Sequence, residues 1–487
     1  MKVYLQSHHT ELYKDFYDII KIFIPNLELD LLDNGKRYDL VISSFEKIDG
    51  NFHLVKFETI FELKEYCSED SCIIKTDSQL LYKKEYKRLV KNSLYSLLKK
   101  IFGKTSPWGS LTGVRPSYLF YESLDSIKSL DKTCSFLQKT YDLDNSKATL
   151  LRDVVKTQLK MKPITDKSVD VYIGIPFCTS RCHYCTFASN KTDESSIKTY
   201  LNSLFKEIGA INNIIDHNNF SLRALYIGGG TPTALDDLSF ESLLKTVDLY
   251  FSQYGEFEYS IEAGRPDTIN EYKLNSMREH NVNRISINPQ TLNDKTLSLI
   301  GRNHSSDDFF ITYDLARKLG FNNINTDIIA ALPKEQLEDF VYTVDEILKL
   351  NPESISVHTL ALKRNSVLSN TGYSYKENDI AKDMIDYARN AVYSTGYNPY
   401  YLYRQKNIVS NLENVAYSKP GYECLYNVDI MEEKISILAA GAGAISKRVN
   451  SEKFEKIQRA PNVSDLKTYN EKITEMINRK YLLFNMR

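Results

Sequence analysis

The sequence is poor in several features that mark other classes of protein. It has seven cysteines in 487 residues, and four of them are scattered along the chain: Cys67, Cys72, Cys134 and Cys424. This sparse pattern fits a reducing compartment and excludes the dense disulfide framework of small secreted proteins. No apolar run approaches the roughly 20 residues that a membrane helix needs, and the N-terminus lacks the pattern of a signal peptide. We therefore expect a cytoplasmic protein without a membrane partner.

The chain also lacks an excess of charge of either sign. Its 62 basic and 63 acidic residues give a formal net charge of -1. No overall field therefore attracts nucleic acid, and we expect none as a partner. With 42% hydrophobic and 26% charged residues, the composition is that of an ordinary globular protein. A chain of this length forms roughly two to four domains.

The remaining three cysteines lie together in the segment GIPFCTSRCHYCTF. Cys178, Cys182 and Cys185 have the spacing Cys-x-x-x-Cys-x-x-Cys. Three thiolates so close together can hold three corners of a 4Fe-4S cluster and leave its fourth iron open to a small molecule. The alternative is a structural zinc site, which needs a fourth ligand and usually a second cysteine pair. Because only His183 is nearby, the spacing favours the cluster.

From Val169 onward, short apolar runs alternate with longer amphipathic segments. Six candidate strands, each followed by helix-like sequence, cover residues 169–175, 223–229, 257–263, 283–289, 323–330 and 354–360. Repeated strand-then-helix units with right-handed crossovers form a parallel sheet that curls into a barrel, and six units form a partial (β/α)6 barrel. The predicted fold class is therefore α/β, and the active site is expected at the carboxyl ends of the strands.

The N-terminal region has the mixed pattern of an α+β domain. Strands are predicted over residues 2–7, 37–45 and 52–59, and helices over 83–102 and about 146–160. The segment PWGSLTGVRP, residues 107–116, is either a structural linker around the only tryptophan or a loop that contacts substrate. The predicted domains are 1–160, 161–375 for the barrel, and 376–487 as a C-terminal extension.

The cysteine spacing, followed by aromatic residues at Tyr184 and Phe187, resembles that of the radical S-adenosylmethionine (SAM) superfamily. From about residue 167 to 446 the chain is similar to the coproporphyrinogen branch, which includes the oxygen-independent coproporphyrinogen III oxidases, related haem chaperones and the longer HemZ-type proteins. The N-terminal region and the PWGSLTGVRP segment favour the HemZ type. The resemblance implies a 4Fe-4S cluster, one or two SAM molecules, and reduced flavodoxin or ferredoxin as electron donor.

The resemblance also implies which residues contact SAM. Gly228 to Gly230, after the second strand, allow a ligand to approach the backbone closely and are similar to the motif that holds the methionine part of SAM. Glu262 ends the third strand and suits ribose hydroxyls or an ammonium group. The implied set is Tyr172, Tyr184, Gly229, Gly230, Thr231, Glu262, Gln290, Arg302, Asp327 and Ala361. The structural alternative for Asp327 and Arg302 is an ion pair between barrel loops.

In the coproporphyrinogen oxidases, as the resemblance implies, a radical derived from SAM removes a hydrogen from a propionate, and loss of carbon dioxide and one further electron leaves a vinyl group. Conversion of coproporphyrinogen III to protoporphyrinogen IX, in haem biosynthesis, is the expected reaction of this oxidoreductase. The substrate is a polyanionic tetrapyrrole whose carboxylates call for basic side chains. The candidates are Lys363, Arg364, Arg404 and Lys406, which could instead be solvated turn residues.

Two departures from the family pattern leave alternatives open. The oxidases have a fourth cysteine two residues after the third, where this chain has Phe187. The chaperones have a histidine linked to haem binding where this chain has Tyr426. The alternatives are a haem-binding chaperone of the same branch and a radical SAM enzyme that modifies haem.

Overall fold

The structure, a computed structural model, describes residues 1–32, 35–185, 193–362, 366–370, 380–405, 408–449 and 457–486. The chain divides into two compact units, Met1–Arg152 and Asp153–Arg487. Within the described ranges, no helix combines the length and the apolarity needed to cross a bilayer.

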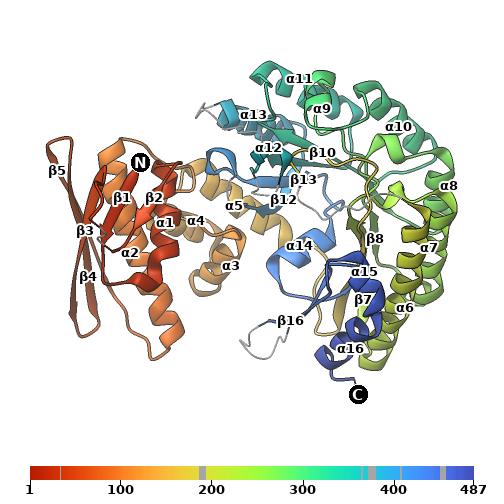
Figure 1. Cartoon of the computed structure of the whole chain (residues 1–487), viewed down its shortest axis with the longest axis horizontal. Coiled ribbons are helices and arrows are strands. Elements are labelled where there is room, and N and C mark those ends of the chain that lie inside the picture. Colours follow the sequence, from red (N-terminus) through yellow and green to blue (C-terminus); the bar gives the residue numbers. More distant parts are fainter. Residues whose placement is uncertain are drawn as a thin grey trace. The chain divides into compact units, whose positions relative to one another are not determined.

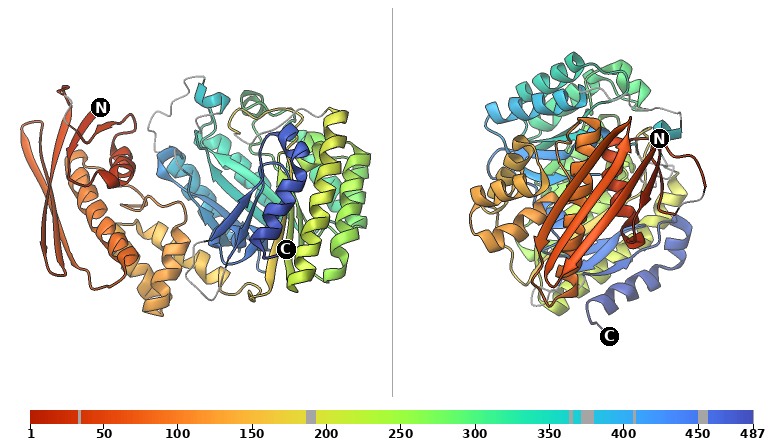
Figure 2. Two further views of the ribbon diagram at one scale, coloured as in Figure 1. Left: turned by 60° about the horizontal axis from the view of Figure 1, so that its bottom comes forward. Right: turned by 90° about the vertical axis from the view of Figure 1, so that its left-hand side faces the viewer.

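The first unit is built on a five-stranded sheet with the order β2-β1-β3-β4-β5. Helices α1 and α2 lie against one face of it (Figures 1 and 2). Its elements are β1 (Lys2–Gln6), α1 (Tyr13–Phe23), β2 (Glu28–Asp30), β3 (Leu40–Asp49), β4 (Phe52–Phe61), β5 (Lys64–Ile73), α2 (Gln79–Phe102), α3 (Pro116–Ile127), α4 (Leu130–Tyr141) and α5 (Asn145–Gln158). The three predicted strands correspond to β1, β3 and β4, and the two predicted helices to α2 and α5. Sequence reasoning missed β2, β5, α1, α3 and α4.

Helix α2 shows why these residues fold as they do. The Ser78 side chain caps its first turn by accepting a hydrogen bond from the Leu81 amide, and Gly103 ends it in the left-handed conformation. Leu89, Val90 and Leu94, at helical spacing, are buried against the sheet. By contrast, the edge strand β5 has the polar sequence KEYCSEDSCI. It contains too few apolar residues to show the alternation of apolar and polar residues from which a strand is predicted.

The PWGSLTGVRP segment is held within the first unit. Trp108 is fully buried, and the amide of Ser110 donates to the Tyr141 carbonyl at 2.9 Å. A Cβ atom at Gly109 would collide with that same carbonyl, and Gly109 has a φ of 51°. These contacts favour the structural interpretation of the segment over the substrate-contacting one.

The second unit contains the predicted barrel. Its six parallel strands, which coincide with the six predicted ones, are β6 (Ser168–Ile175), β7 (Ser221–Gly229), β8 (Glu258–Ile261), β9 (Arg284–Ser286), β10 (Ile324–Ala330) and β11 (Ser354–Thr359). Helices cover the outside of the strands (Figure 1): α6 (Glu194–Asn218), α7 (Asp237–Phe251), α8 (Glu271–Glu279), α9 (Asp294–Leu299), α10 (Ser306–Lys318) and α11 (Leu337–Leu350). The predicted partial (β/α)6 barrel is confirmed.

C-terminal strands extend this sheet at both edges, giving the order β12-β13-β11-β10-β9-β8-β7-β6-β14-β15-β16. The elements after the barrel are α12 (Val367–Asn370), α13 (Ile380–Ser394), β12 (Asn398–Tyr403), β13 (Asn414–Ser418), α14 (Leu425–Glu432), β14 (Ser436–Ala440), β15 (Ile445–Arg448), β16 (Gln458–Pro461), α15 (Leu466–Glu471) and α16 (Ile473–Leu483). Pairing β13 with β11 and β14 with β6 satisfies the backbone groups that an open barrel leaves free at its edges.

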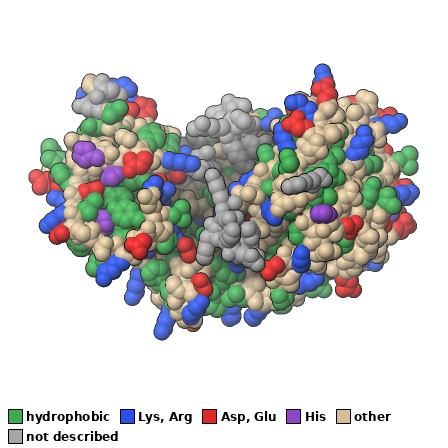
Figure 3. Space-filling view, turned by 90° about the horizontal axis from the view of Figure 1, so that it is seen from below, with side chains coloured by type: hydrophobic (Ala, Val, Ile, Leu, Met, Phe, Trp, Pro, Cys, Tyr) green, Lys and Arg blue, Asp and Glu red, His purple; other side chains and the backbone are tan. Residues whose placement is uncertain are grey.

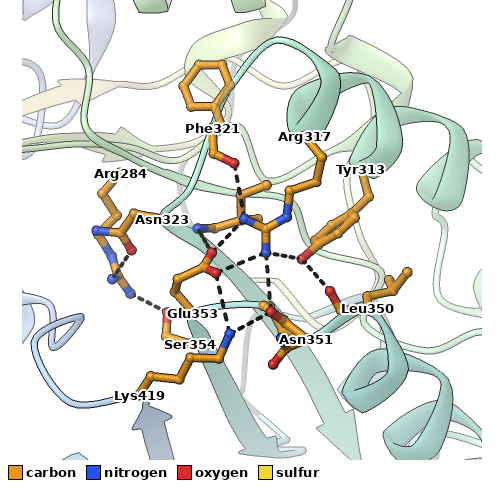
Figure 4. A network of polar contacts seen from close by, with 12 residues as sticks. Arg284, Tyr313, Arg317, Phe321, Asn323, Leu350, Asn351, Glu353, Ser354 and Lys419 are labelled. Atoms are coloured by element: carbon orange, nitrogen blue, oxygen red, sulfur yellow. Dashed lines mark hydrogen bonds and ion pairs between the residues drawn. The ribbon is translucent and has the colours of Figure 1, made fainter.

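A polar network joins the amino-terminal ends of the barrel strands (Figure 4). The Glu353 carboxylate, just before β11, accepts hydrogen bonds from Arg317 of α10 at 2.8 and 3.2 Å. It also accepts from the Ile324 amide at 3.0 Å and lies 3.5 Å from the Lys419 ammonium. The network therefore fixes the end of the barrel opposite the expected active site.

The surface carries charges of both signs. Figure 3 shows basic and acidic side chains interspersed over one face, in keeping with the balanced composition.

Candidate functional site

The cysteine loop begins directly after β6 and is fastened to the segment that follows α9. The His183 amide donates to the Ile300 carbonyl at 2.8 Å, and its Nδ1 lies 2.7 Å from the Leu299 carbonyl. The Ser180 hydroxyl donates to the Gly301 carbonyl at 3.3 Å. His183, the possible fourth zinc ligand, is thus engaged through its backbone and one ring nitrogen in holding the loop.

The three cysteines of the loop are not joined in disulfides, and they influence one another. Burial raises the pKa of Cys178, and the neighbouring Cys185 and Cys182 add to the rise, whereas Thr231 and Arg265 lower it. The Cys178 Sγ lies 3.5 Å from the Thr231 hydroxyl. Among the described residues, no three His, Cys, Asp or Glu side chains are grouped to share one metal ion. A 4Fe-4S cluster differs in that each cysteine binds a different iron.

The glycine-rich turn after β7 runs against the cysteine loop. The amide of Gly230 donates to the Ile175 carbonyl at 2.8 Å, and that of Thr231 donates to the Phe177 carbonyl at 2.7 Å. A Cβ atom at Gly230 would lie 2.5 Å from the Phe177 carbonyl oxygen, so glycine is required there. Gly229 has a φ of 111°. The structure therefore brings the predicted Gly229, Gly230 and Thr231 next to Cys178.

Glu262 lies beside this turn, at the carboxyl end of β8. Its Oε2 accepts a hydrogen bond from the Gly229 amide at 3.1 Å, and its Oε1 accepts from the Tyr226 hydroxyl at 2.6 Å. Burial raises the pKa of Glu262 to about 7. The Tyr226 ring stacks on Tyr426 at 4.5 Å between centroids, and Tyr172 stacks on Tyr426 at 5.9 Å. The predicted Tyr172 thus shares an aromatic cluster with the partner of Glu262.

Asn288, which sequence reasoning missed, connects Asp327 and Arg302. The side-chain amide of Asn288 donates to the Asp327 carboxylate at 2.8 Å. Its backbone carbonyl accepts from the Arg302 guanidinium at 2.6 Å. Arg302 also contacts the Gly264 carbonyl at 3.1 Å. The described ion pairs do not join Asp327 to Arg302, so the simple salt-bridge alternative does not describe them. The sequence feature that could have identified Asn288 is its position as a polar residue near the end of the fourth predicted strand.

Gln290, Tyr184 and Ala361 occupy different positions around the same end of the barrel. Gln290 forms an isolated bridge with Ile328 of β10 and has a φ of 68°. Tyr184 lies within the cysteine loop, where burial raises its pKa and Cys182 and Arg302 are close enough to influence it. Ala361, after β11, is 8% exposed and forms a bridge with Ile408.

Of the predicted substrate-facing residues, Lys363, Arg364 and Lys406 lie outside the described residues, as does Phe187 of the cysteine loop. Arg404 is buried at 4% exposure, and its guanidinium contacts the Asn411 side chain. Burial lowers the pKa of Arg404 to about 10.

These residues fit the cofactors that the sequence analysis expected. Three thiols outside any disulfide can ligate a cluster, and the glycine turn packs so closely on the cysteine loop that a Cβ atom at Gly230 would collide with it. Carboxylates at Glu262 and Asp327 and the buried guanidinium of Arg302 can bind the polar groups of a zwitterionic nucleoside. The glycine turn and Glu262 lie at the carboxyl ends of β7 and β8, where such barrels bind ligands, whereas Asp327 lies within β10 and Arg302 in the segment after α9.

Comparison with known proteins gives the same superfamily that the sequence resembles. The family model of the radical SAM superfamily matches residues 172–347. Together with the barrel and the three-cysteine loop, it defines a radical SAM protein. Membership of this superfamily implies a 4Fe-4S cluster and SAM as cofactors.

The chain is 38% identical over 414 residues to the oxygen-independent coproporphyrinogen-III oxidase-like protein HemZ of Bacillus subtilis, covering 82% of this chain and 81% of that protein. It is 34% identical over 200 residues to the haem chaperone HemW of the same organism, covering 41% of this chain and 52% of that protein. The fold is similar to the solved structure of Escherichia coli coproporphyrinogen III oxidase (HemN), with a TM-score of 0.50 and 23% identity over 68% of this chain and 73% of that one. The chain therefore belongs to the HemZ-type family of oxygen-independent coproporphyrinogen-III oxidase-like proteins.

Proposed function

We propose that this protein is a radical SAM oxidoreductase that oxidatively decarboxylates propionate side chains of coproporphyrinogen III to vinyl groups without oxygen, giving protoporphyrinogen IX. The observation that carries the proposal is the placement of the three-cysteine loop beside a glycine turn and Glu262 at the carboxyl ends of the barrel strands. The likeness to a protein named as oxidase-like supports the choice of a tetrapyrrole substrate.

Cys178, Cys182 and Cys185 would hold the cluster, and the backbone from Gly229 to Thr231 would face the amino-acid part of SAM. Held there, the cluster would supply one-electron reduction of SAM, and the radical chemistry that follows would act on a C–H bond of the propionate. The chain's own contribution is to position both molecules and to exclude water around them.

Glu262 is proposed to bind SAM in its ionised form. With a pKa of about 7, it carries charge above neutral pH, when it can accept from a ribose hydroxyl or an ammonium group. The hydrogen bonds from Tyr226 and Gly229 fix both carboxylate oxygens before the ligand arrives. Asn288 links Asp327 of β10 to Arg302, which also donates to the carbonyl of Gly264, two residues after Glu262.

The direct test is anaerobic reconstitution of the cluster, followed by incubation with SAM, a reductant and coproporphyrinogen III. We expect SAM cleavage together with mass-spectrometric loss of carbon dioxide from the tetrapyrrole. Cys182→Ala should abolish both activities and lower the iron content. Cys67→Ala, at an exposed cysteine of the first unit, is the matched control and should keep them.

Cleavage of SAM without any change in coproporphyrinogen III would reject this substrate while leaving the superfamily chemistry in place. Full SAM cleavage by Cys182→Ala would reject the cluster assignment itself. If haem, offered in parallel, gained or lost mass, a haem-modifying activity would replace the proposed one.

A haem-binding chaperone is the second candidate, because the chain is similar to HemW over 200 residues. Tyr426, in place of the chaperones' histidine, is the residue that could ligate ferric haem as tyrosinate. The structure does not favour that role. Tyr426 is 5% exposed and stacked on Tyr226, and burial raises its pKa well above its usual range, so that the tyrosinate is not formed near neutral pH.

Titration with haem, followed by absorption spectroscopy, separates the two candidates. We expect no specific haem band from the wild type and no difference for Tyr426→Phe, because the ring is occupied by aromatic packing. A saturable haem band that disappears in Tyr426→Phe would support the chaperone and contradict our interpretation of this residue.

A further inference from the structure

Arg265 lies against the cluster loop and was not among the residues that the sequence singled out. It follows β8 by four residues and directly precedes the 3-10 turn Pro266–Thr268. Its side chain is 3% exposed. A buried guanidinium needs partners for its donors, and in this case the partners are Asp267 and the loop that carries the three cysteines.

One nitrogen of Arg265 faces the cluster loop. Nη1 donates to the Ser180 carbonyl at 3.0 Å and lies 3.8 Å from the Cys182 Sγ, within the distance of a hydrogen bond to sulfur. Cys182 itself is 9% exposed. The guanidinium therefore meets this thiol where little water can screen the interaction.

The other two nitrogens of Arg265 are held by Asp267. Nε donates to Oδ1 and Nη2 to Oδ2, both at 3.1 Å, which is the two-pronged geometry of a strong arginine-carboxylate pair. The same Asp267 Oδ2 accepts from the Thr179 hydroxyl at 3.4 Å. Arg265 and Asp267 thus contact the loop at Thr179, Ser180 and Cys182, and Asp267 fixes the direction in which Nη1 points.

This arrangement has a consequence for a cluster bound to Cys182. Hydrogen bonds to the cysteine sulfurs and nearby charge are among the factors that set the reduction potential of iron-sulfur clusters. Reduction adds negative charge, so a cation beside one ligand stabilises the reduced form more than the oxidised form. A carboxylate at the same place has the opposite effect.

We propose that Arg265 is a positioning residue that orients Cys182 and raises the reduction potential of the cluster, and that Asp267 holds the guanidinium in place and partly offsets its charge. The inference rests on the proposed cluster and is independent of the tetrapyrrole substrate. Arg265 acts through Cys182, and this role requires no contact between Arg265 and SAM.

The test is a redox titration of the reconstituted cluster, followed by electron paramagnetic resonance, without SAM or tetrapyrrole. Arg265→Met should shift the midpoint potential to a more negative value, because the cation and its N–H donor are lost. Asp267→Asn should shift it to a more positive value, because an amide oxygen can still anchor Arg265 while the negative charge is gone. Arg278→Met, on the exposed end of α8, is the matched control and should leave the potential unchanged.

The outcomes are distinguishable from failure of the proposed function. If the wild type assembles no cluster, the cluster assignment fails. If the variants retain their iron and their potentials equal that of the wild type, Arg265 is merely a brace and this inference is wrong. Should Arg265→Met lose its cluster, Asp267→Asn decides alone: a positive shift supports the inference, and no shift or a negative one overturns it.

Discussion

At the scale of single residues, Glu262 shows how a binding site can cost stability. Its carboxyl group is surrounded by protein, and both of its oxygens already accept hydrogen bonds from Tyr226 and Gly229. Even so, burial outweighs these bonds and raises its pKa to about 7 from an ordinary value of 4.5. A folded state that holds a proton more tightly than the unfolded state loses stability as pH rises through the interval between the two pKa values.

We therefore expect Glu262→Gln to be more stable than the wild type at pH 8 by about 1–3 kcal/mol, since each pKa unit corresponds to about 1.4 kcal/mol. The advantage should shrink toward pH 5, where the buried group is protonated. The glutamine can keep both contacts, because its amide can donate to the Tyr226 hydroxyl. Urea unfolding at the two pH values measures the difference.

Glu256→Gln, at an exposed position ahead of the same strand, is the control and should show no such pH dependence. An equal gain of stability for Glu262→Gln at both pH values would contradict the assignment of the raised pKa to this group.

At the scale of elements, the C-terminal helices are fastened to the barrel by one buried carboxylate. Glu207 of α6 forms an ion pair with Lys480 of α16, and both side chains are fully buried. Glu207 also accepts from the Asn462 side chain at 2.8 Å, from the Tyr469 hydroxyl at 2.5 Å and from the Gly441 amide at 2.8 Å. Gly441 follows β14, the strand beside β6, so this cluster fixes the C-terminal segment next to the strand that leads into the cysteine loop.

Lys480→Met is expected to lower the free energy of unfolding by about 3–5 kcal/mol, because it leaves a buried carboxylate without its charge partner. Lys467→Met, which removes an 85% exposed lysine of α15, should change it by less than about 1 kcal/mol. Denaturant unfolding compares the two variants.

The double variant Lys480→Met with Glu207→Leu should recover part of the loss, since no unpaired charge then remains in the interior. If Lys480→Met were as stable as the Lys467 variant, the ion pair would have no role in holding α16.

At the scale of the whole molecule, the two units have separate cores. Val55, Phe57 and Leu94 belong to the core of the first unit, whereas the contacts described for the cysteine loop come from residues of the second. Separate cores allow one unit to lose stability without the other.

Phe57→Ala should destabilise the first unit by about 3–5 kcal/mol, because it opens a cavity at a fully buried ring. At temperatures where that unit alone unfolds, the iron content of the reconstituted protein should stay at its wild-type level. Calorimetry and iron analysis on the same samples measure both quantities. Loss of iron in step with the first transition would show that the first unit supports the cluster.

Part of this architecture could be predicted from the sequence because its signals are local. A run such as Val169 to Ile175 must be buried on both faces, and Cys178, Cys182 and Cys185 are close in the chain whatever the fold. The polar strand β5 could not be predicted, since its residues owe their conformation to pairing with β4 and not to their own pattern.

The sequence by itself determined the six-strand barrel, the three-thiolate loop and the glycine turn, because spacing and periodicity are properties of neighbouring residues. The tertiary structure alone decided that Arg265 reaches Cys182, that Asn288 stands between Asp327 and Arg302, and that Tyr426 is packed between rings. These contacts join residues 14 to 254 positions apart, on elements that meet only when the sheet curls, and no local pattern encodes such contacts.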